Sequence, residues 1–272
     1  MTARALDGQI AVVTGASRGI GRAISVELAS HGAHVVCTAR TERPRDDIAG
    51  TLTETVERIT SAGGRATAHR ADLLIPGDLD ALATAVLEDH GRVDIVVNNA
   101  AYIGDAVFES VWDMTPESWS NMIELNVNVP WRLTKAFAPS MRTRGRGLVV
   151  NLSSSSSHAP PPGTAAPLPG AGGLGAAYPT SKAALTHMTA LIGNELRAEG
   201  ITMVAIDPGF AASESAAILA SRLGADVAWA QPVEVAAKAT GWIATCADPL
   251  QYAGAFIVAR ELADEHGLLP AS

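Results

Sequence analysis

The sequence lacks several features that would assign it to a specialised class. No apolar run reaches the roughly 18 residues that a membrane-spanning helix needs. The first residues do not show the apolar stretch and small-residue cleavage site of a secretory signal. Only two cysteines occur, Cys37 and Cys246, far apart and outside any metal-like cluster, so both are expected to be free, buried thiols. We therefore expect a cytoplasmic protein with neither a membrane anchor nor a metal site.

Aromatic and charged residues are also scarce. Aromatic residues make up 4% of the chain, charged residues make up 18%, and the net charge is −8. The lysines and arginines are scattered, so the sequence offers no basic surface for nucleic acid or anionic lipid. Hydrophobic residues, by contrast, form 47% of the 272 residues, which is enough for a large buried core.

Short apolar runs alternate with longer segments of helical periodicity. This alternation predicts an α/β fold: a doubly wound, Rossmann-like parallel sheet with helices on both faces, in three layers. We expect a single domain over residues 1–272, with a Pro/Gly-rich loop at about 155–177 between strands of the same sheet. The predicted strands are 9–14, 34–39, 65–73, 93–100, 147–154, 202–208 and 254–259, and the main predicted helices are 19–32, 46–64, 77–91, 115–145 and 178–199.

The first strand is followed by a glycine-rich turn, "TGASRGIG", from Thr14 to Gly21. Glycines between a strand and a helix let the backbone turn tightly and approach a pyrophosphate, which the helix N-terminus then favours. The alternative is a glycine-rich turn without a ligand.

The spacing TGxxxGxG resembles that of the short-chain dehydrogenase/reductase family. The resemblance extends over nearly the whole chain through "NNAA", "NLSS", "YPTSK" and "DPG", in the family's order. Three departures are "NNAA" in place of the usual NNAG, the missing "DGG" near the C-terminus, and a long insertion before Tyr178. The resemblance implies hydride transfer with a nicotinamide cofactor, bound by Gly15, Ser17, Arg18, Gly19, Ile20, Gly21, Arg40, Asp72, Asn98, Tyr178, Lys182, Pro208 and Gly209.

The residue after the second strand bears on the choice of cofactor. An acid there favours NAD, whereas Arg40 favours the 2′-phosphate of NADP, and Arg18 adds a second positive charge. Both arginines are alternatively solvated surface residues, and the nearby Glu42 leaves NAD(H) possible. Asp72 resembles the family's adenine contact, or else caps a turn. Asn98 resembles the residue that stabilises the central sheet. We predict NADP(H), with NAD(H) as the alternative.

Tyr178 and Lys182 lie four residues apart, on one face of a predicted helix. With three tyrosines and three lysines in the chain, this spacing arises by chance in roughly 3% of shuffled sequences. An ammonium about 5 Å from a phenolate stabilises it by about 3 kcal/mol at an effective dielectric of about 20, which would lower the phenol pKa by roughly two units. We therefore predict Tyr178 as the general acid/base and Lys182 as its partner, a role that its counterpart in the family combines with binding the nicotinamide ribose.

The resemblance supplies two further catalytic residues. "NLSS" matches the family's "NISS" and selects Ser154, with Ser153 and Ser155 as alternatives if the register slips. "ELNVNVPWRL" resembles the family's "DVNLTG" and selects Asn126, beside a local kink that holds a water linked to the lysine. Asn128 is off register. The alternative for Asn126 is a polar helix residue that bonds its own backbone.

These residues together predict an NADP(H)-dependent oxidoreductase. The segment after "DPG" is apolar and contains Phe210 and Trp229, which favours a carbonyl or secondary alcohol of an apolar small molecule. The alternatives are a nucleotide-binding sensor or scaffold without turnover, and an epimerase, lyase or dehalogenase. The loop between Ser154 and Tyr178 is predicted either as a lid or as an idle insertion. We also expect a homo-oligomer that pairs through residues 115–143 and 178–199.

Overall fold

The computed structural model describes residues 4–43, 48–75, 77–103, 105–163, 174–217 and 230–270. Within these residues the strands form one parallel sheet in the order β3-β2-β1-β4-β5-β6-β7. The predicted doubly wound fold is therefore confirmed. The strands are β1 Ile10–Thr14, β2 His34–Ala39, β3 Arg65–Arg70, β4 Ile95–Asn98, β5 Gly147–Leu152, β6 Ile201–Asp207 and β7 Phe256–Val258.

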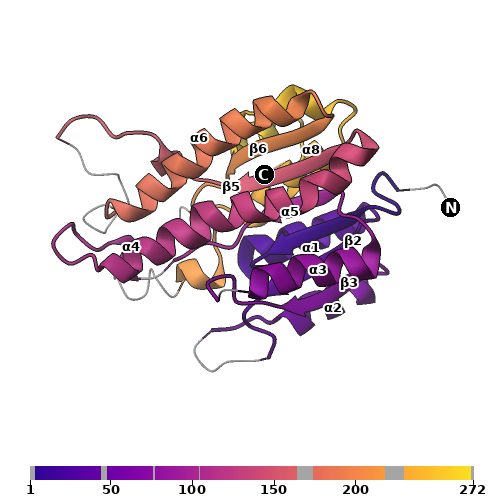
Figure 1. Cartoon of the computed structure of the whole chain (residues 1–272), viewed down its shortest axis with the longest axis horizontal. Coiled ribbons are helices and arrows are strands. Elements are labelled where there is room, and N and C mark those ends of the chain that lie inside the picture. Colours follow the sequence, from indigo (N-terminus) through magenta and orange to yellow (C-terminus); the bar gives the residue numbers. More distant parts are fainter. Residues whose placement is uncertain are drawn as a thin grey trace.

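Helices cover both faces of the sheet (Figure 1). Residues alternate between the two faces along each strand, so that in β1 Val13 packs with α1, α2, α8 and α9, while Val12 packs with α3 and α5. Both faces are thus apolar, which explains the continuous hydrophobic runs of the central strands. The helices are α1 Gly19–Ser30, α2 Leu52–Ser61, α3 Asp78–His90, α4 Pro116–Ile123, α5 Val129–Arg144, α6 Ala177–Arg197, α8 Glu234–Thr245 and α9 Ala259–Glu265.

The predicted helix 46–64 begins later than expected. Thr51 caps α2, because its side chain accepts a hydrogen bond from the backbone N–H of Glu54 at 3.1 Å. A threonine in extended conformation at this position is a favourable N-cap. The helix therefore starts at Leu52.

The predicted helix 115–145 is interrupted by a π-helical turn, Glu124–Asn128. The backbone N–H of Val129 bonds the carbonyl of Glu124, one residue further back than in an α-helix. Pro130 has no N–H to donate to the carbonyl of Asn126, so an uninterrupted α-helix is not available here. The local kink implied by the family resemblance is present, with Asn126 at its centre.

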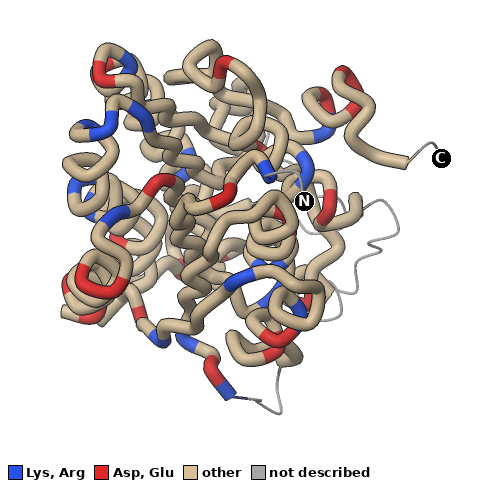
Figure 2. Tube along the Cα trace, turned by 90° about the vertical axis from the view of Figure 1, so that its right-hand side faces the viewer, with Lys and Arg blue, Asp and Glu red and all other residues tan. Residues whose placement is uncertain are grey.

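Four further details concern the last strand, the cysteines, the character of the helices and the distribution of charge. β7 has three residues and leads directly into α9, so the predicted last strand is shorter than expected. Cys37 is a free, buried thiol, but Cys246 is partly exposed, so its predicted burial is wrong. None of the described helices has the length and apolar character needed to cross a membrane. Acidic and basic residues are interspersed along the trace in Figure 2.

The sheet grows from β1 through β2 to β3 on one side and from β4 to β7 on the other side. The winding order therefore switches between β1 and β4, which lie side by side. Parallel sheets of this type bind ligands at the carboxyl ends of the strands beside such a switch point. The turns that follow β1, β2 and β4 are therefore where a ligand is expected.

Candidate active site

The turn after β1 requires its glycines. Gly15 and Gly19 adopt positive φ angles of +67° and +54°, which side chains other than glycine rarely accept. A Cβ atom on Gly21 would overlap the carbonyl oxygen of Gly15. The Asn99 side chain holds the turn by donating to the carbonyl of Thr14 at 2.8 Å, so this residue shapes the loop. Sequence reasoning missed Asn99, although it is the second asparagine of "NNAA".

A cleft of about 420 Å³ opens at the carboxyl ends of these strands. It brings together most of the predicted cofactor residues: Gly15, Ser17, Arg18, Gly19, Ile20, Gly21, Arg40 and Asp72. Its lining also includes Asn99, Ala100, Ala101, Ser213 and Ser215, which were not predicted. Ser213 and Ser215 lie a few residues after "DPG". Their position beside the glycine loop follows from the fold and from no local sequence motif.

Five of the predicted cofactor residues are not among those that line the cleft: Asn98, Tyr178, Lys182, Pro208 and Gly209. Asn98 is buried beneath it and donates to the side chain of Asn151 at 2.8 Å, which matches the expected role in the sheet. Pro208 and Gly209 lie beside Gln231, whose side-chain amide donates to the Pro208 carbonyl. The segment after β6 reaches the cleft a few residues further on.

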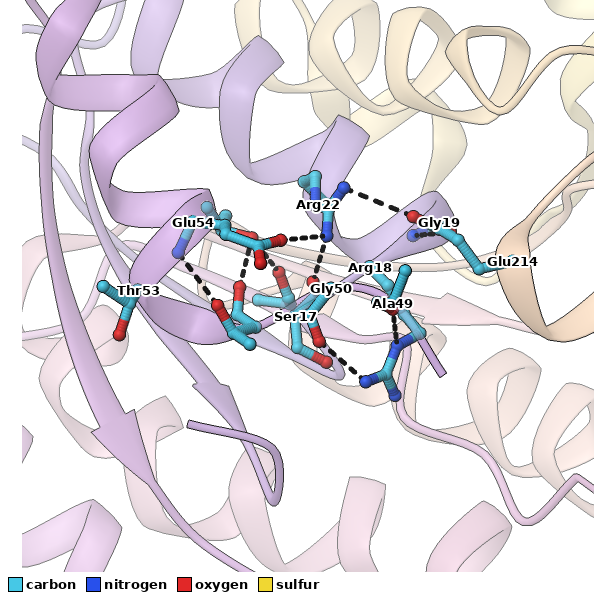
Figure 3. Close-up of polar contacts among 12 residues, drawn as sticks. Ser17, Arg18, Gly19, Arg22, Ala49, Gly50, Thr53, Glu54 and Glu214 are labelled. Carbon is cyan, nitrogen blue, oxygen red and sulfur yellow. Dashed lines mark hydrogen bonds and ion pairs between the residues drawn. The ribbon is translucent and has the colours of Figure 1, made fainter. Parts of the chain in front are cut away.

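Arg18 and Arg40 give one end of the cleft a positive charge. The Arg18 guanidinium donates to the carbonyls of Ala49 and Gly50 at 2.8 and 2.7 Å (Figure 3), while Arg40 is exposed at the rim. Asp72 lines the cleft and also accepts a hydrogen bond from the backbone N–H of Leu74 at 3.2 Å. Both interpretations of Asp72, a cleft residue and a turn cap, therefore describe its geometry.

Tyr178 and Lys182 project from the start of α6 towards the end of β5. The Lys182 ammonium lies 5.7 Å from the centroid of the Tyr178 ring. Lys182 is 3% exposed and donates to the carbonyl of Leu152 at 2.7 Å. The side chain of Ser154 forms a hydrogen bond with that of Tyr178. The predicted serine, tyrosine and lysine thus form one cluster.

The structure distinguishes the three adjacent serines. Ser153 is buried under α6, where its hydroxyl pairs with that of Thr186 at 2.6 Å. Ser155 is exposed. Ser154 lies between them in extended conformation and is the serine that bonds Tyr178. The register inferred from "NLSS" therefore agrees with the geometry.

Asn126 joins the same cluster from the opposite side. Its side chain is buried, donates to the hydroxyl of Ser181 at 2.9 Å and accepts from the backbone N–H of Tyr102 at 2.8 Å. Ser181 in turn donates to the backbone carbonyl of Tyr178 at 2.8 Å. The Asn126 side chain therefore bonds partners far from its own helical turn, unlike a helix residue that satisfies only its own backbone. Asn128 is exposed and bonds Glu124.

The pKa of Tyr178 is shifted in the direction opposite to the one predicted from its spacing to Lys182. Burial, together with the negative charge of Asp207, raises the pKa of Tyr178 to about 12, although the hydrogen bond from Ser154 acts in the opposite direction. Burial lowers the pKa of Lys182 to about 8, and Asp207 partly opposes this. The predicted lowering of the tyrosine pKa by the lysine is therefore wrong for the protein groups alone, because desolvation outweighs the attraction.

Asp207 is a member of this site that sequence reasoning missed. It is 5% exposed at the end of β6, and its carboxylate accepts a hydrogen bond from the backbone N–H of Gly209 at 2.9 Å. Its electrostatic effect reaches both Tyr178 and Lys182. The signal in the sequence was an acid directly after a buried apolar strand, inside "DPG". A buried carboxylate of this kind favours a neutral phenol, which is the form that donates a proton.

The long loop before Tyr178 is described only at its two flanks. His158 packs edge-on against Phe256, with ring centroids 4.9 Å apart. Gly175 donates to the carbonyl of Val107 at 2.8 Å and lies against the backbone of Glu109. Residues 164–173 and Trp229 lie outside the described residues, so the predicted lid remains a prediction.

Known proteins resemble this chain in sequence and fold. The short chain dehydrogenase family profile matches residues 9–223. The short-chain reductase protein NovJ of Streptomyces niveus is 32% identical over 80% of this chain and 74% of its own length. The 3-oxoacyl-[acyl-carrier-protein] reductase FabG of Escherichia coli is 31% identical over 75% of this chain and 74% of its own. A crystal structure of a metagenomic short-chain oxidoreductase in complex with NADP is 33% identical, with a TM-score of 0.74 over 93% of this chain and 97% of the other.

Proposed function

The chain belongs to the short-chain dehydrogenase/reductase family, and from that premise we propose that it transfers hydride between NADP(H) and the carbonyl or secondary alcohol of an apolar small molecule. The observation that carries the proposal is the cluster of Ser154, Tyr178 and Lys182 at the carboxyl end of β5, on the same edge of the sheet as the cleft built around the glycine-rich turn. No single motif would support it as well as this convergence of residues from different elements.

The proposed reaction, in the direction of reduction, divides between the cofactor and the chain. The nicotinamide supplies the hydride. Ser154 donates a hydrogen bond to the substrate carbonyl oxygen, and Tyr178 protonates that oxygen as negative charge develops on it. The Lys182 ammonium stabilises the resulting phenolate. Asn126 fixes the start of α6 through Ser181 and so orients Tyr178.

The pKa shifts support the direction of reduction. A tyrosine whose pKa lies near 12 is protonated at neutral pH and is ready to act as an acid. In the reverse direction it must first lose that proton, which the buried carboxylate of Asp207 disfavours. The cofactor-free site therefore holds Tyr178 in the protonated form that reduction uses.

The preference for NADP(H) rests on charge at one end of the cleft. Arg40 follows β2, where the adenosine ribose of a dinucleotide is expected, and Arg18 lies across the same end. A 2′-phosphate carries negative charge that arginine guanidinium groups bind well. The NADP complex of the related metagenomic oxidoreductase supports the same choice. NAD(H) is the alternative cofactor.

The surroundings of Tyr178 support an apolar substrate. Tyr178 packs against a cluster that includes Val107, Phe108, Met122 and Leu174. Apolar surroundings of this kind favour an apolar carbonyl compound over a charged sugar or acid. We also propose a homo-oligomer, because α4 and α5 expose Trp119 and Trp131. The proposed location is the cytoplasm, in keeping with two free thiols.

The test is NADPH oxidation, followed by absorbance, against a panel of ketones, aldehydes and quinones. We expect at least one apolar carbonyl compound to be reduced by the wild type and not by Tyr178→Phe. Tyr252→Phe is the matched control, because its hydroxyl lies in a different part of the fold and accepts a hydrogen bond from Trp242. Equal rates in the two variants would contradict the proposed role of Tyr178.

A further inference from the structure

The N-terminus of α1 lacks a cap from its own sequence. Its N-cap residue, Arg18, makes no side-chain capping bond, and the first turn contains no acidic residue. The free N–H groups and partial positive charge of a helix start favour a carboxylate nearby. The chain supplies one from 195 positions away: the carboxylate of Glu214 accepts a hydrogen bond from the backbone N–H of Gly19 at 2.9 Å.

The same carboxylate is held by an arginine of α1. Its second oxygen lies 3.2 Å from the Arg22 guanidinium. Arg22 also donates to the carbonyl of Ser17 at 2.6 Å and lies 3.5 Å from the carboxylate of Glu54 on α2 (Figure 3). The Arg22 side chain is 17% exposed, so these interactions are only partly screened by water. One guanidinium thus ties the glycine loop, α2 and the segment after β6 together.

Residues on either side of Glu214 face the cleft. Ser213 and Ser215 line it, whereas Glu214 is absent from its lining. Glu214 borders a separate cavity of about 590 Å³ between α1 and α8, which Ser213 also borders. A Cβ atom on Gly19 would lie 3.0 Å from the Cβ of Ser213, so the segment already rests directly on the glycine loop. Glu214 therefore holds the segment from the side of the second cavity, while Ser213 and Ser215 reach the cleft.

From this geometry we infer that Glu214 is a positioning residue that holds Ser213 and Ser215 against the glycine loop, where they contact the phosphates of the bound dinucleotide. The inference rests on the proposed function, because it needs a dinucleotide in the cleft. It assigns the carboxylate a role in retaining the cofactor and none in the chemical step. A competing role would have the opposite effect on cofactor affinity. If the Glu214 carboxylate took the place of a phosphate at the helix N-terminus, it would have to leave before the cofactor binds, and it would weaken binding.

Calorimetric titration with NADPH separates the two roles. Glu214→Gln keeps the shape of the side chain and removes its charge, so we expect the Kd for NADPH to rise about tenfold. Glu27→Gln is the matched control. Glu27 also borders the cavity between α1 and α8, and it pairs with Lys238 at 2.8 Å, away from the glycine loop. This substitution removes the same charge and is expected to change the Kd by less than about twofold.

Kinetics and hydrogen exchange supply readouts that a general loss of stability would not reproduce. In Glu214→Gln, KM for NADPH should rise about as much as Kd, while kcat at saturating NADPH stays within about twofold of the wild type. Without cofactor, the backbone amides of residues 209–217 should exchange faster in Glu214→Gln than in Glu27→Gln. In a cycle with Arg22→Gln, the double variant should lose less affinity for NADPH than the sum of the two single losses, because the two side chains share one interaction.

Three outcomes would overturn the inference. Tighter binding of NADPH by Glu214→Gln would identify the carboxylate as a competitor of the cofactor. Equal affinities in Glu214→Gln and Glu27→Gln, with normal binding by the wild type, would overturn the inference and leave the proposed function in place. Failure of the wild type to bind either NADPH or NADH would overturn the proposed function, and the inference with it.

Discussion

Removing the charge of Asp207 should move the alkaline limb of the pH profile to lower pH. The carboxylate raises the pKa of Tyr178 and also raises that of Lys182. In Asp207→Asn both pKa values should therefore fall, the first below about 12 and the second below about 8. The general acid must be protonated and the lysine charged for reduction, so the direction of the change does not depend on which group controls the limb.

The size of the shift follows from the electrostatics of the site. Asp207 is 5% exposed and accepts its hydrogen bond from the backbone N–H of Gly209, so it acts on the pair through space. Two unit charges about 7 Å apart interact by about 2.4 kcal/mol at an effective dielectric of about 20. That energy corresponds to about 1.7 pKa units. We therefore expect the limb to move down by about one to two pH units.

The assay is kcat/KM for carbonyl reduction between pH 6 and pH 11, which reports the ionisations of the free enzyme. Asp94→Asn is the matched control: Asp94 is equally buried at 3% exposure but lies before β4, where it holds Arg144 at 3.1 Å and the backbone N–H of Ile10 at 2.9 Å. It should lower stability without moving the limb. A limb that stays in place in Asp207→Asn, or moves to higher pH, would refute the reasoning.

Three other predictions address the remaining parts of the site. Tyr178→Phe should lower kcat by about 10²–10⁴-fold with calorimetric binding of NADPH nearly unchanged, and a kcat close to that of the wild type would exclude this tyrosine as the acid. Arg40→Asp should shift the ratio of kcat/KM values from NADPH towards NADH; an equal ratio in the two proteins would show that Arg40 does not contact the 2′-phosphate. Shortening residues 158–175 to a four-residue turn should change KM or kcat if the loop closes over the substrate, and unchanged kinetics in a folded variant would identify an idle insertion.

The sequence predicted the sheet well because its central strands are buried on both faces. Runs such as Ile10–Val13 and Ile95–Val97 are apolar throughout, and that pattern can be read from the sequence without knowledge of tertiary contacts. The break at Glu124–Asn128 was harder, because a proline at 130 is compatible with the first turn of a new helix. The resemblance to a family located the kink, but the geometry of a π-helical turn depends on which backbone bonds form.

The candidate site was predictable where its residues share a local motif. Tyr178 and Lys182 lie one helical turn apart, so their proximity follows from helix geometry. Asp207 and Glu214 reach their partners only through the fold: Glu214 meets Gly19 across 195 positions. The sign of the tyrosine pKa shift was missed for a related reason, since burial is a property of the packed protein and no spacing rule reports it.

The central claim, hydride transfer assisted by Tyr178, is tested most directly by following an isotope. The enzyme is supplied with NADPH carrying deuterium at the transferred position of C4, together with the best carbonyl substrate from the panel, and the alcohol product is examined by mass spectrometry. The account predicts one deuterium on the former carbonyl carbon with the wild type, and at least about 100-fold slower labelling with Tyr178→Phe. Alcohol formed without deuterium, or labelling by Tyr178→Phe at the wild-type rate, would contradict it.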